Sequence, residues 1–289
     1  MTNSPASSPP RAARPREYRI EPRFLAGSTH TGDPGLLPLL DAGWALSRDD
    51  LGNVLVTSPD HTVRLGFLPE GERGDLWMIT AHADAFAPPE WQVTLDLSAP
   101  PEIVGEFTAA LAATHSAAPS SVLHGDTGGW DMTDHLLDKR GWRLEGEGAT
   151  AVFRSPDGLL ALHKRLGYLR PETEMAGDAE RWTVEVGPPG HRWYATATSN
   201  LPDHLLDTLT TAIASPAPVQ RYLRPSELAH LPSQATATPT APSPLEVARI
   251  RAATARSTPT PRASASALAY TTATRSAVLP TPALTGRAR

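Results

Sequence analysis

Leu39-Leu-Asp-Ala-Gly-Trp44 is a stretch that returns later in the chain as Leu136-Leu-Asp-Lys-Arg-Gly-Trp142. Downstream of this stretch, Ser58-Pro-Asp60 returns as Ser155-Pro-Asp157. Six of the seven tryptophans also form pairs, at separations of 98, 105 and 102 residues: Trp44 with Trp142, Trp77 with Trp182, and Trp91 with Trp193. A self-repeat decides the domain organisation before any other pattern does. Each copy is about 100 residues long, a common domain size, so the sequence predicts two copies of one domain.

Within each copy the hydrophobic pattern predicts a helix, a set of strands and a second helix. Residues 91–97 alternate apolar and polar side chains, which indicates a strand with one buried face. Residues 103–111 and 205–213 carry apolar side chains at helical spacing, which indicates a helix with one buried side. Asp33 and Pro34 predict the start of the first opening helix and Gly43 its end. The extended segments are expected at 44–48, 53–57, 61–68, 76–82 and 91–97, and at 142–145, 149–154, 159–166, 181–186 and 192–198.

The expected fold class is therefore α+β, with two repeated units that each run helix, antiparallel five-strand meander, helix. We expect the first repeat at residues 17–118, a linker at 119–129 and the second repeat at 130–231. The terminal segments 1–16 and 232–289 are rich in Pro, Ala, Ser, Thr and Arg. Because they are poor in large apolar side chains, we expect disordered tails there.

One segment of the C-terminal tail has helical features. Ser243-Pro-Leu-Glu246 has the spacing of a capping box with proline at the first helical position. The sequence predicts a short helix at 244–256 that forms on a partner, with Glu246 and Arg249 as candidate interaction residues.

Charge and composition exclude several classes of protein. Residues 17–232 hold 30 acidic and 16 basic side chains, so the folded body is not expected to bind nucleic acid. The chain has no cysteine, which excludes disulfides and thiolate chemistry. We find no secretory signal and no apolar run of membrane-spanning length, and we therefore predict a cytoplasmic protein without a membrane partner.

The repeated phrases resemble one known family. The Ser-Pro-Asp pair, the Leu-Leu-Asp phrase before Gly-Trp, and Val63-Arg-Leu-Gly-Phe-Leu-Pro-Glu70 are similar to the SPDY-type domain, also called domain of unknown function 317. The resemblance covers about residues 17–230 and is looser in the second copy, where Gly158 follows the aspartate. It implies a tandem fold, an actinobacterial cytoplasm and an unassigned role, and it supplies no catalytic residues.

The most conspicuous motifs have structural interpretations. Proline after serine, with aspartate next, is the composition of a β-turn, so Ser-Pro-Asp predicts a hairpin turn and not a nucleophile. The paired tryptophans predict core packing. Trp130 has no pair and lies next to a glycine-rich linker. We expect it to fix the linker to the next helix, and the alternative is an exposed interaction residue.

A stretch rich in histidine and aspartate lies where the two repeats join. His124, Asp131, His135 and Asp138 are candidate metal ligands because imidazole and carboxylate both bind divalent cations. Their spacing matches no known site. The phrase Asp-His-Leu-Leu-Asp, at 134–138 and again at 203–207, is explained by solvent-facing polar residues beside a leucine stripe.

The preferred functional hypothesis is a non-enzymatic interaction or scaffold protein that binds a protein partner without a cofactor. One alternative is an enzyme or metal-binding protein that uses the histidine and aspartate stretch. A second alternative is weak nucleic-acid association through the arginine-rich tails. The partner and the oligomeric state stay open.

Overall fold

The computed structural model describes residues 15–29, 32–69, 75–96, 98–123, 141–146, 148–241, 247–249 and 251–252. Its chain divides into two units, residues 1–240 and residues 241–289. In the second unit, the described residues 247–249 and 251–252 are helical, and Arg249 is exposed. Glu246 and the other residues of the helix expected at 244–256 lie outside the described ranges.

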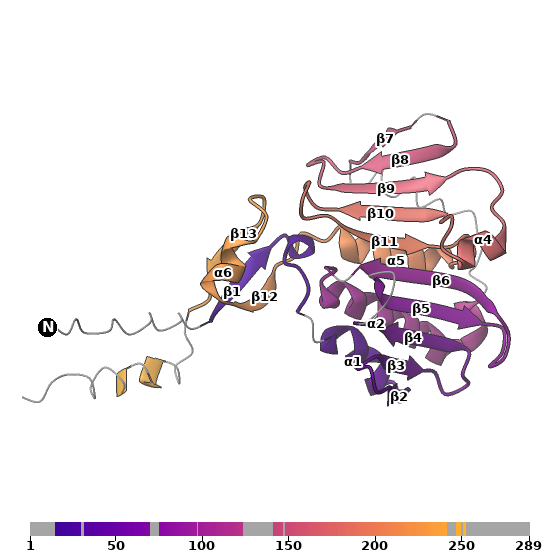
Figure 1. Cartoon of the computed structure of the whole chain (residues 1–289), viewed down its shortest axis with the longest axis horizontal. Helices are drawn as coiled ribbons and strands as arrows, with labels where there is room; N and C mark the ends of the chain where they lie inside the picture. The colour runs from indigo at the N-terminus through magenta and orange to yellow at the C-terminus, as the bar shows by residue number, and fades with distance from the viewer. Residues whose placement is uncertain are drawn as a thin grey trace, which may run out of the picture. The chain divides into compact units, whose positions relative to one another are not determined.

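The first unit is built on one antiparallel sheet of ten strands (Figure 1). Its order is β2-β3-β4-β5-β6-β11-β10-β9-β8-β7, so each half of the sheet comes from one half of the chain. The strands are β2 (Ala45–Arg48), β3 (Val54–Thr57), β4 (Val63–Phe67), β5 (Asp75–His82), β6 (Pro89–Asp96), β7 (Arg143–Glu145), β8 (Thr150–Arg154), β9 (Leu160–Arg165), β10 (Trp182–Val186) and β11 (Trp193–Ala197).

The two halves join through β6 and β11, which pair around a pseudo-two-fold axis. Thr94 lies opposite Thr196, with Leu95 opposite Ala195 and Val93 opposite Ala197. The hydroxyls of Thr94 and Thr196 are 2.8 Å apart, and these two residues are 102 positions apart in sequence. Thr94 and Thr196, at equivalent positions of the two repeats, therefore face one another, and the residues on either side of them pair crosswise, which is the arrangement of an isologous dimer interface.

The strand register also places the paired tryptophans at equivalent positions. Trp77 lies opposite Leu95 in β6, and Trp182 lies opposite Ala197 in β11. All six paired tryptophans are buried, with Trp77 and Trp91 fully inaccessible. The prediction that they form the core is confirmed.

Three of the helices in the described part of the chain are longer than one or two turns and accompany the large sheet. They are α1 (Asp33–Asp41), α2 (Pro101–Ala117) and α5 (Asp203–Ile213); α2 packs against both of the others. The buried side of α2 includes Ile103, Val104, Phe107 and Leu111, as the spacing predicts. The predicted mixed class with a large antiparallel sheet is confirmed. The helix expected to open the second repeat, at 131–141, lies almost wholly outside the described residues, and the full repeat pattern stays a prediction there.

Two local predictions are wrong. Asp33 is the first residue of α1 and does not cap it, because the N-cap is Gly32 in a left-handed conformation with φ +71°. The acidic composition of residues 172–180 predicts a solvated turn, and the structure differs there. This stretch contains α4 (Pro171–Met175), whose Glu174 is only 4% exposed. The Glu174 carboxylate accepts hydrogen bonds from the Ser199 backbone N–H and hydroxyl, both at 2.9 Å, which explains its burial.

A second, three-stranded sheet corrects the predicted tail boundaries. β1 (Arg16–Glu21) lies between β12 (Val219–Leu223) and β13 (Thr236–Pro239), so residues from both predicted tails form strands. A short α6 (Pro225–Ala229) connects β12 to β13. Composition places β13 and Arg16 in the predicted tails, because these segments lack large apolar side chains, whereas the rest of β1 and all of β12 lie within the predicted repeats. The backbone groups of these strands are satisfied only by strands distant in sequence.

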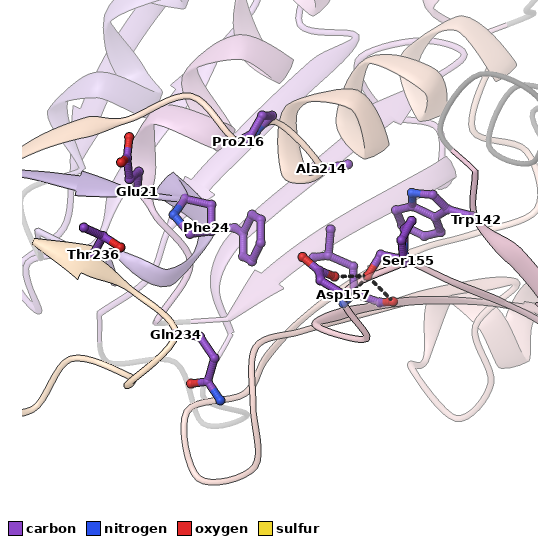
Figure 2. A pocket seen from close by; sticks show the side chains of 12 residues that line it. Glu21, Phe24, Trp142, Ser155, Asp157, Ala214, Pro216, Gln234 and Thr236 are labelled. Atoms are coloured by element: carbon purple, nitrogen blue, oxygen red, sulfur yellow. Dashed lines mark hydrogen bonds between the residues drawn. The ribbon is translucent and has the colours of Figure 1, made fainter.

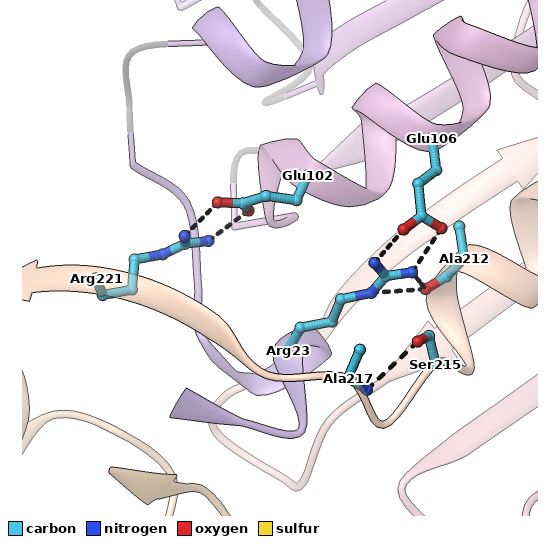
Figure 3. Close-up of polar contacts among 7 residues, drawn as sticks. All are labelled: Arg23, Glu102, Glu106, Ala212, Ser215, Ala217 and Arg221. Atoms are coloured by element: carbon cyan, nitrogen blue, oxygen red, sulfur yellow. Dashed lines mark hydrogen bonds and ion pairs between the residues drawn. The ribbon is translucent and has the colours of Figure 1, made fainter. Parts of the chain in front are cut away.

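Two arginines join this small sheet to helix α2 (Figure 3). Arg23, in the 3₁₀ turn η1 (Arg23–Leu25), forms a bidentate pair with Glu106 and also donates to the Ala212 carbonyl oxygen. Arg221 forms a second bidentate pair, with Glu102. Both arginines are buried, and planar bidentate pairing fixes position as well as charge.

Candidate functional site

The Ser-Pro-Asp turn of the first repeat joins β3 to β4, as predicted. The Ser58 hydroxyl donates to Asp60 Oδ1 at 2.6 Å and accepts the Val63 backbone N–H at 2.9 Å. Thr62 donates to the same Asp60 oxygen through its backbone N–H and its hydroxyl. The serine and the aspartate therefore hold the hairpin closed by satisfying each other and the backbone.

A histidine from the closing helix completes this turn. Nε2 of His115, near the end of α2, lies 3.0 Å from each carboxylate oxygen of Asp60. The His115 ring also meets Trp44 edge-on, with ring centroids 5.3 Å apart. His115 is 7% exposed, so its ring fills the space between the aspartate and the tryptophan. The sequence reasoning did not identify this residue.

Ser58, Asp60 and His115 do not form a catalytic triad. In a triad the histidine contacts the nucleophile and the aspartate orients the histidine. Here the aspartate lies between the other two side chains and receives a hydrogen bond from each. Ser58 is 1% exposed, and its hydroxyl already accepts a backbone N–H. The arrangement is a structural clamp.

The clamp changes the acidity of Asp60. Partial burial by itself raises the pKa of Asp60. Hydrogen bonds from Ser58, Thr62 and His115 outweigh this effect and hold the pKa well below its ordinary value. A carboxyl whose pKa is lowered in the folded state stabilises the fold above its unfolded pKa of about 4, and this contribution is lost as the pH falls further.

We therefore expect Asp60→Asn to be less stable than the wild type by about 1 kcal/mol at neutral pH. The figure is small because the Asp60 side chain is 38% exposed and solvent screens its contacts. The difference should shrink as the pH falls below about 4, because the unfolded wild type then takes up a proton at Asp60 that the folded protein does not bind. Urea unfolding of both proteins between about pH 7 and pH 3 measures it, and a difference that stays constant over this range would contradict the assignment.

The second Ser-Pro-Asp turn repeats the first in its backbone and its inner hydrogen bonds. The Ser155 hydroxyl donates to Asp157 Oδ1 at 2.5 Å and accepts the Leu160 N–H at 3.0 Å. The residue after the aspartate has a left-handed conformation in both turns, with φ 62° at His61 and φ 71° at Gly158. Glycine adopts this conformation without the steric penalty that other residues meet.

The closing helix differs between the repeats, and this difference creates the site. α2 continues for six residues beyond Leu111, whereas α5 ends at Ile213, the residue equivalent to Leu111. Pro216 and Pro218 follow, and proline lacks the N–H that a continuing helix needs. The position equivalent to His115 is Ala217, which lies in the connection to β12 and carries no imidazole.

A cavity of about 590 Å³ lies beside the second turn (Figure 2). Figure 2 shows Glu21 and Thr236, from the small sheet, on one side and Trp142, Ser155 and Asp157, from the second repeat, on the other. Phe24 projects between them. The full lining is Glu21, Pro22, Phe24, Trp142, Ser155, Pro156, Asp157, Leu160, Ala214, Pro216, Gln234 and Thr236.

The lining combines apolar walls with negative charge. Two of the twelve lining residues, Glu21 and Asp157, are acidic, and none is basic. Among the described residues, the Asp157 carboxylate accepts hydrogen bonds through Oδ1, from the Ser155 hydroxyl and the Leu159 N–H. In the first turn, by contrast, the Oδ2 oxygen of Asp60 has a hydrogen-bond partner among the described residues, Nε2 of His115. A concave apolar site with a few polar groups is the usual form of a ligand pocket.

The N-terminal segment forms part of this pocket through a contact that differs between the repeats. The Trp91 indole N–H donates to the carbonyl oxygen of Val122, just after α2. The equivalent Trp193 instead donates to the carbonyl oxygen of Phe24, at 2.9 Å. η1 therefore covers the second repeat and places Phe24 at the pocket.

A second cavity, of about 800 Å³, lies on another side of η1. Its wall mixes basic and acidic side chains, including His191, Arg192, Arg221 and Glu227. Arg221 is already paired with Glu102. Neither Ser-Pro-Asp turn contributes to its lining.

The structure does not test the metal hypothesis at the junction of the repeats. His124, Trp130, Asp131, His135 and Asp138 all lie outside the described residues. The described part of the chain contains no group of three or more histidine, aspartate or glutamate side chains that could hold a metal.

In the described phrase, at 203–207, the prediction of solvent-facing polar residues holds only in part. His204 is exposed, but Asp207 is half-buried, and its Oδ1 has no partner among the described residues. Although the residue as a whole is exposed, partial desolvation of its ring lowers the pKa of His204, and the neighbouring Asp203 carboxylate opposes this shift.

Residues 57–117 and 154–219 match the family model SPDY, described as domain of unknown function (DUF317). The predicted resemblance is confirmed over these two segments, which are shorter than the predicted range of 17–230. Each segment begins at the Ser-Pro-Asp turn and includes the closing helix. No curated protein and no solved structure matches the chain. Among the described residues, no helix is long and apolar enough to cross a membrane.

Proposed function

We propose that this chain, which carries two SPDY segments at residues 57–117 and 154–219, is a non-enzymatic binding protein whose second repeat receives a partner protein. The observation that carries the proposal is the difference between the two Ser-Pro-Asp turns. The first turn is closed by His115, whereas the second opens onto a cavity of about 590 Å³. One repeat serves as framework and the other as binding site.

The described polar residues support binding more than catalysis. The most complete polar cluster, around Asp60, is buried and internally satisfied. At the second turn, Ser155 is buried and its hydroxyl is held by Asp157 and the backbone. A nucleophile needs an accessible hydroxyl next to a general base, and neither serine meets this condition.

A photo-crosslinking residue at position 234 tests the proposal in the cells that produce the protein. Gln234 lines the pocket and is exposed, so a bound partner lies within reach of this position. We expect a discrete crosslinked protein, identified by mass spectrometry. The same residue at position 51 is the control, because Leu51 is 70% exposed and lies away from the pocket lining.

Paired substitutions separate the pocket from general stability. Asp157→Asn should weaken the crosslink at position 234, because it removes one of the two negative charges that line the pocket. Asp60→Asn, the same change at the first turn, should leave the crosslink intact. Identical crosslinks from positions 234 and 51, or equal losses in the two variants, would show that the pocket does not bind the partner.

A further inference from the structure

We infer that the pocket beside Asp157 binds an imidazole group, supplied by a histidine side chain of the partner. The inference rests on the proposed function and specifies its chemistry. It comes from comparing the two repeats, because the first repeat already contains the group that the second lacks.

The frame that holds His115 exists in both repeats. Trp44 directly precedes β2, and Trp142 directly precedes β7. β2 pairs with β3, and β7 pairs with β8 in the same register, since Ala45 faces Thr57 and Arg143 faces Arg154. Both facing residues directly precede the Ser-Pro-Asp turns. Trp142 and Asp157 therefore occupy the positions of Trp44 and Asp60.

The first repeat shows what this frame accommodates. The His115 ring lies edge-on to Trp44 and shares its Nε2 between both oxygens of Asp60, at 3.0 Å each. This contact requires an N–H donor on a flat ring. The position arises from the longer α2 helix, so in the second repeat the donor has to come from elsewhere.

The second repeat retains the acceptor and adds charge. The Asp157 hydrogen bonds described use Oδ1, which leaves Oδ2 for an incoming donor. Glu21 adds a second carboxylate to the lining and no lining residue is basic, so a protonated ring is favoured over a neutral apolar group. The volume of about 590 Å³ exceeds one imidazole and leaves room for the main chain that carries it.

Titration of the full chain with imidazole at neutral pH tests the inference. The Trp142 indole N–H resonance, assigned with a Trp142→Phe variant, reports occupancy. We expect saturable binding with a millimolar dissociation constant, since so small a ligand gains little affinity. Asp157→Asn should weaken binding about tenfold or more, as expected for loss of a charged hydrogen bond. Thiazole has a similar shape but no N–H, and it should not bind detectably.

His115→Gly provides the matched control in the first repeat. This change empties the Trp44–Asp60 frame, and added imidazole should raise the melting temperature of the variant toward that of the wild type. Adding Asp60→Asn should abolish the rescue. If His115→Gly does not fold, the comparison of wild type with Asp157→Asn decides the question alone.

The outcomes separate the ligand from the proposed function. Imidazole binding that is equal in wild type and Asp157→Asn, matched by thiazole, or absent would overturn the imidazole assignment. A crosslink from position 234 that persists in that case would leave the binding function standing with another ligand. If positions 234 and 51 gave identical crosslinks, or if Asp157→Asn and Asp60→Asn weakened the crosslink equally, the proposed function itself would be overturned.

Discussion

Arg23→Ala will lower the free energy of unfolding by about 2–3 kcal/mol. The change removes the bidentate pair with Glu106 and the hydrogen bonds to the Ala212 carbonyl oxygen, which then loses a buried donor. It also removes the aliphatic part of a side chain that is 7% exposed. Glu106 is half-exposed and can be solvated, which keeps the loss below that of a fully buried ion pair. Urea unfolding followed by tryptophan fluorescence measures the difference.

Arg19→Ala is the control for this variant. Arg19 lies in the neighbouring strand β1, its side chain is 59% exposed, and its nearest carboxylate, on Glu21, is 4.0 Å away. Exposed ion pairs of this kind contribute little, so a change below about 0.5 kcal/mol is expected. If both variants lost the same stability, the Arg23–Glu106 pair would not be an important link between the small sheet and α2.

Trp193→Ala will have a larger effect, about 4 kcal/mol. Trp193 is 2% exposed and packs in the common core, so truncation leaves a cavity. The change also breaks the hydrogen bond to the Phe24 carbonyl oxygen, which fixes η1 on the second repeat. We therefore expect faster amide exchange in β1 and β12 as well as lower stability, measured by hydrogen–deuterium exchange under native conditions.

Trp193→Phe separates the two contributions. The phenyl ring keeps most of the packing but cannot donate to Phe24, so a loss of about 1–2 kcal/mol is expected, with faster exchange confined to the N-terminal segment. Trp91→Phe is the matched variant, because Trp91 donates to Val122 instead. Faster exchange at residues 16–26 in both variants alike would argue against a specific role for Trp193.

Features with a local cause could be predicted from the sequence. The buried tryptophans, the helical stripe of α2 and the Ser-Pro-Asp turns depend on spacing or turn composition within a few residues. Antiparallel strands followed from the same patterns, but their union into one sheet through β6 and β11 did not. The predictable features are visible in one sequence because the residues that determine them are neighbours along the chain.

The rest depends on contacts between distant residues. Arg23 contacts residues 83 and 189 positions away, and β1 pairs with strands near residue 220 and residue 238. Nothing near these residues indicates such partners. The pocket had a signal in the difference between the copies: His115 in the first, and Pro216 and Pro218 in place of a longer helix in the second. The apolar stripes of the two helices match up to Leu111 and Ile213, and the difference begins only beyond these residues.

The pairing of β6 with β11 inside one chain affects how the sequences of the two repeats can diverge. If two separate copies of one polypeptide paired around Thr94, every substitution would appear twice, and a pocket opened in one copy would be opened in both. Because the two repeats lie in one chain, a substitution in one repeat leaves the other unchanged. The first repeat can keep His115 in contact with Asp60 and so preserve the stability of the fold. The second repeat can accumulate substitutions that would destabilise the protein too much if both repeats carried them.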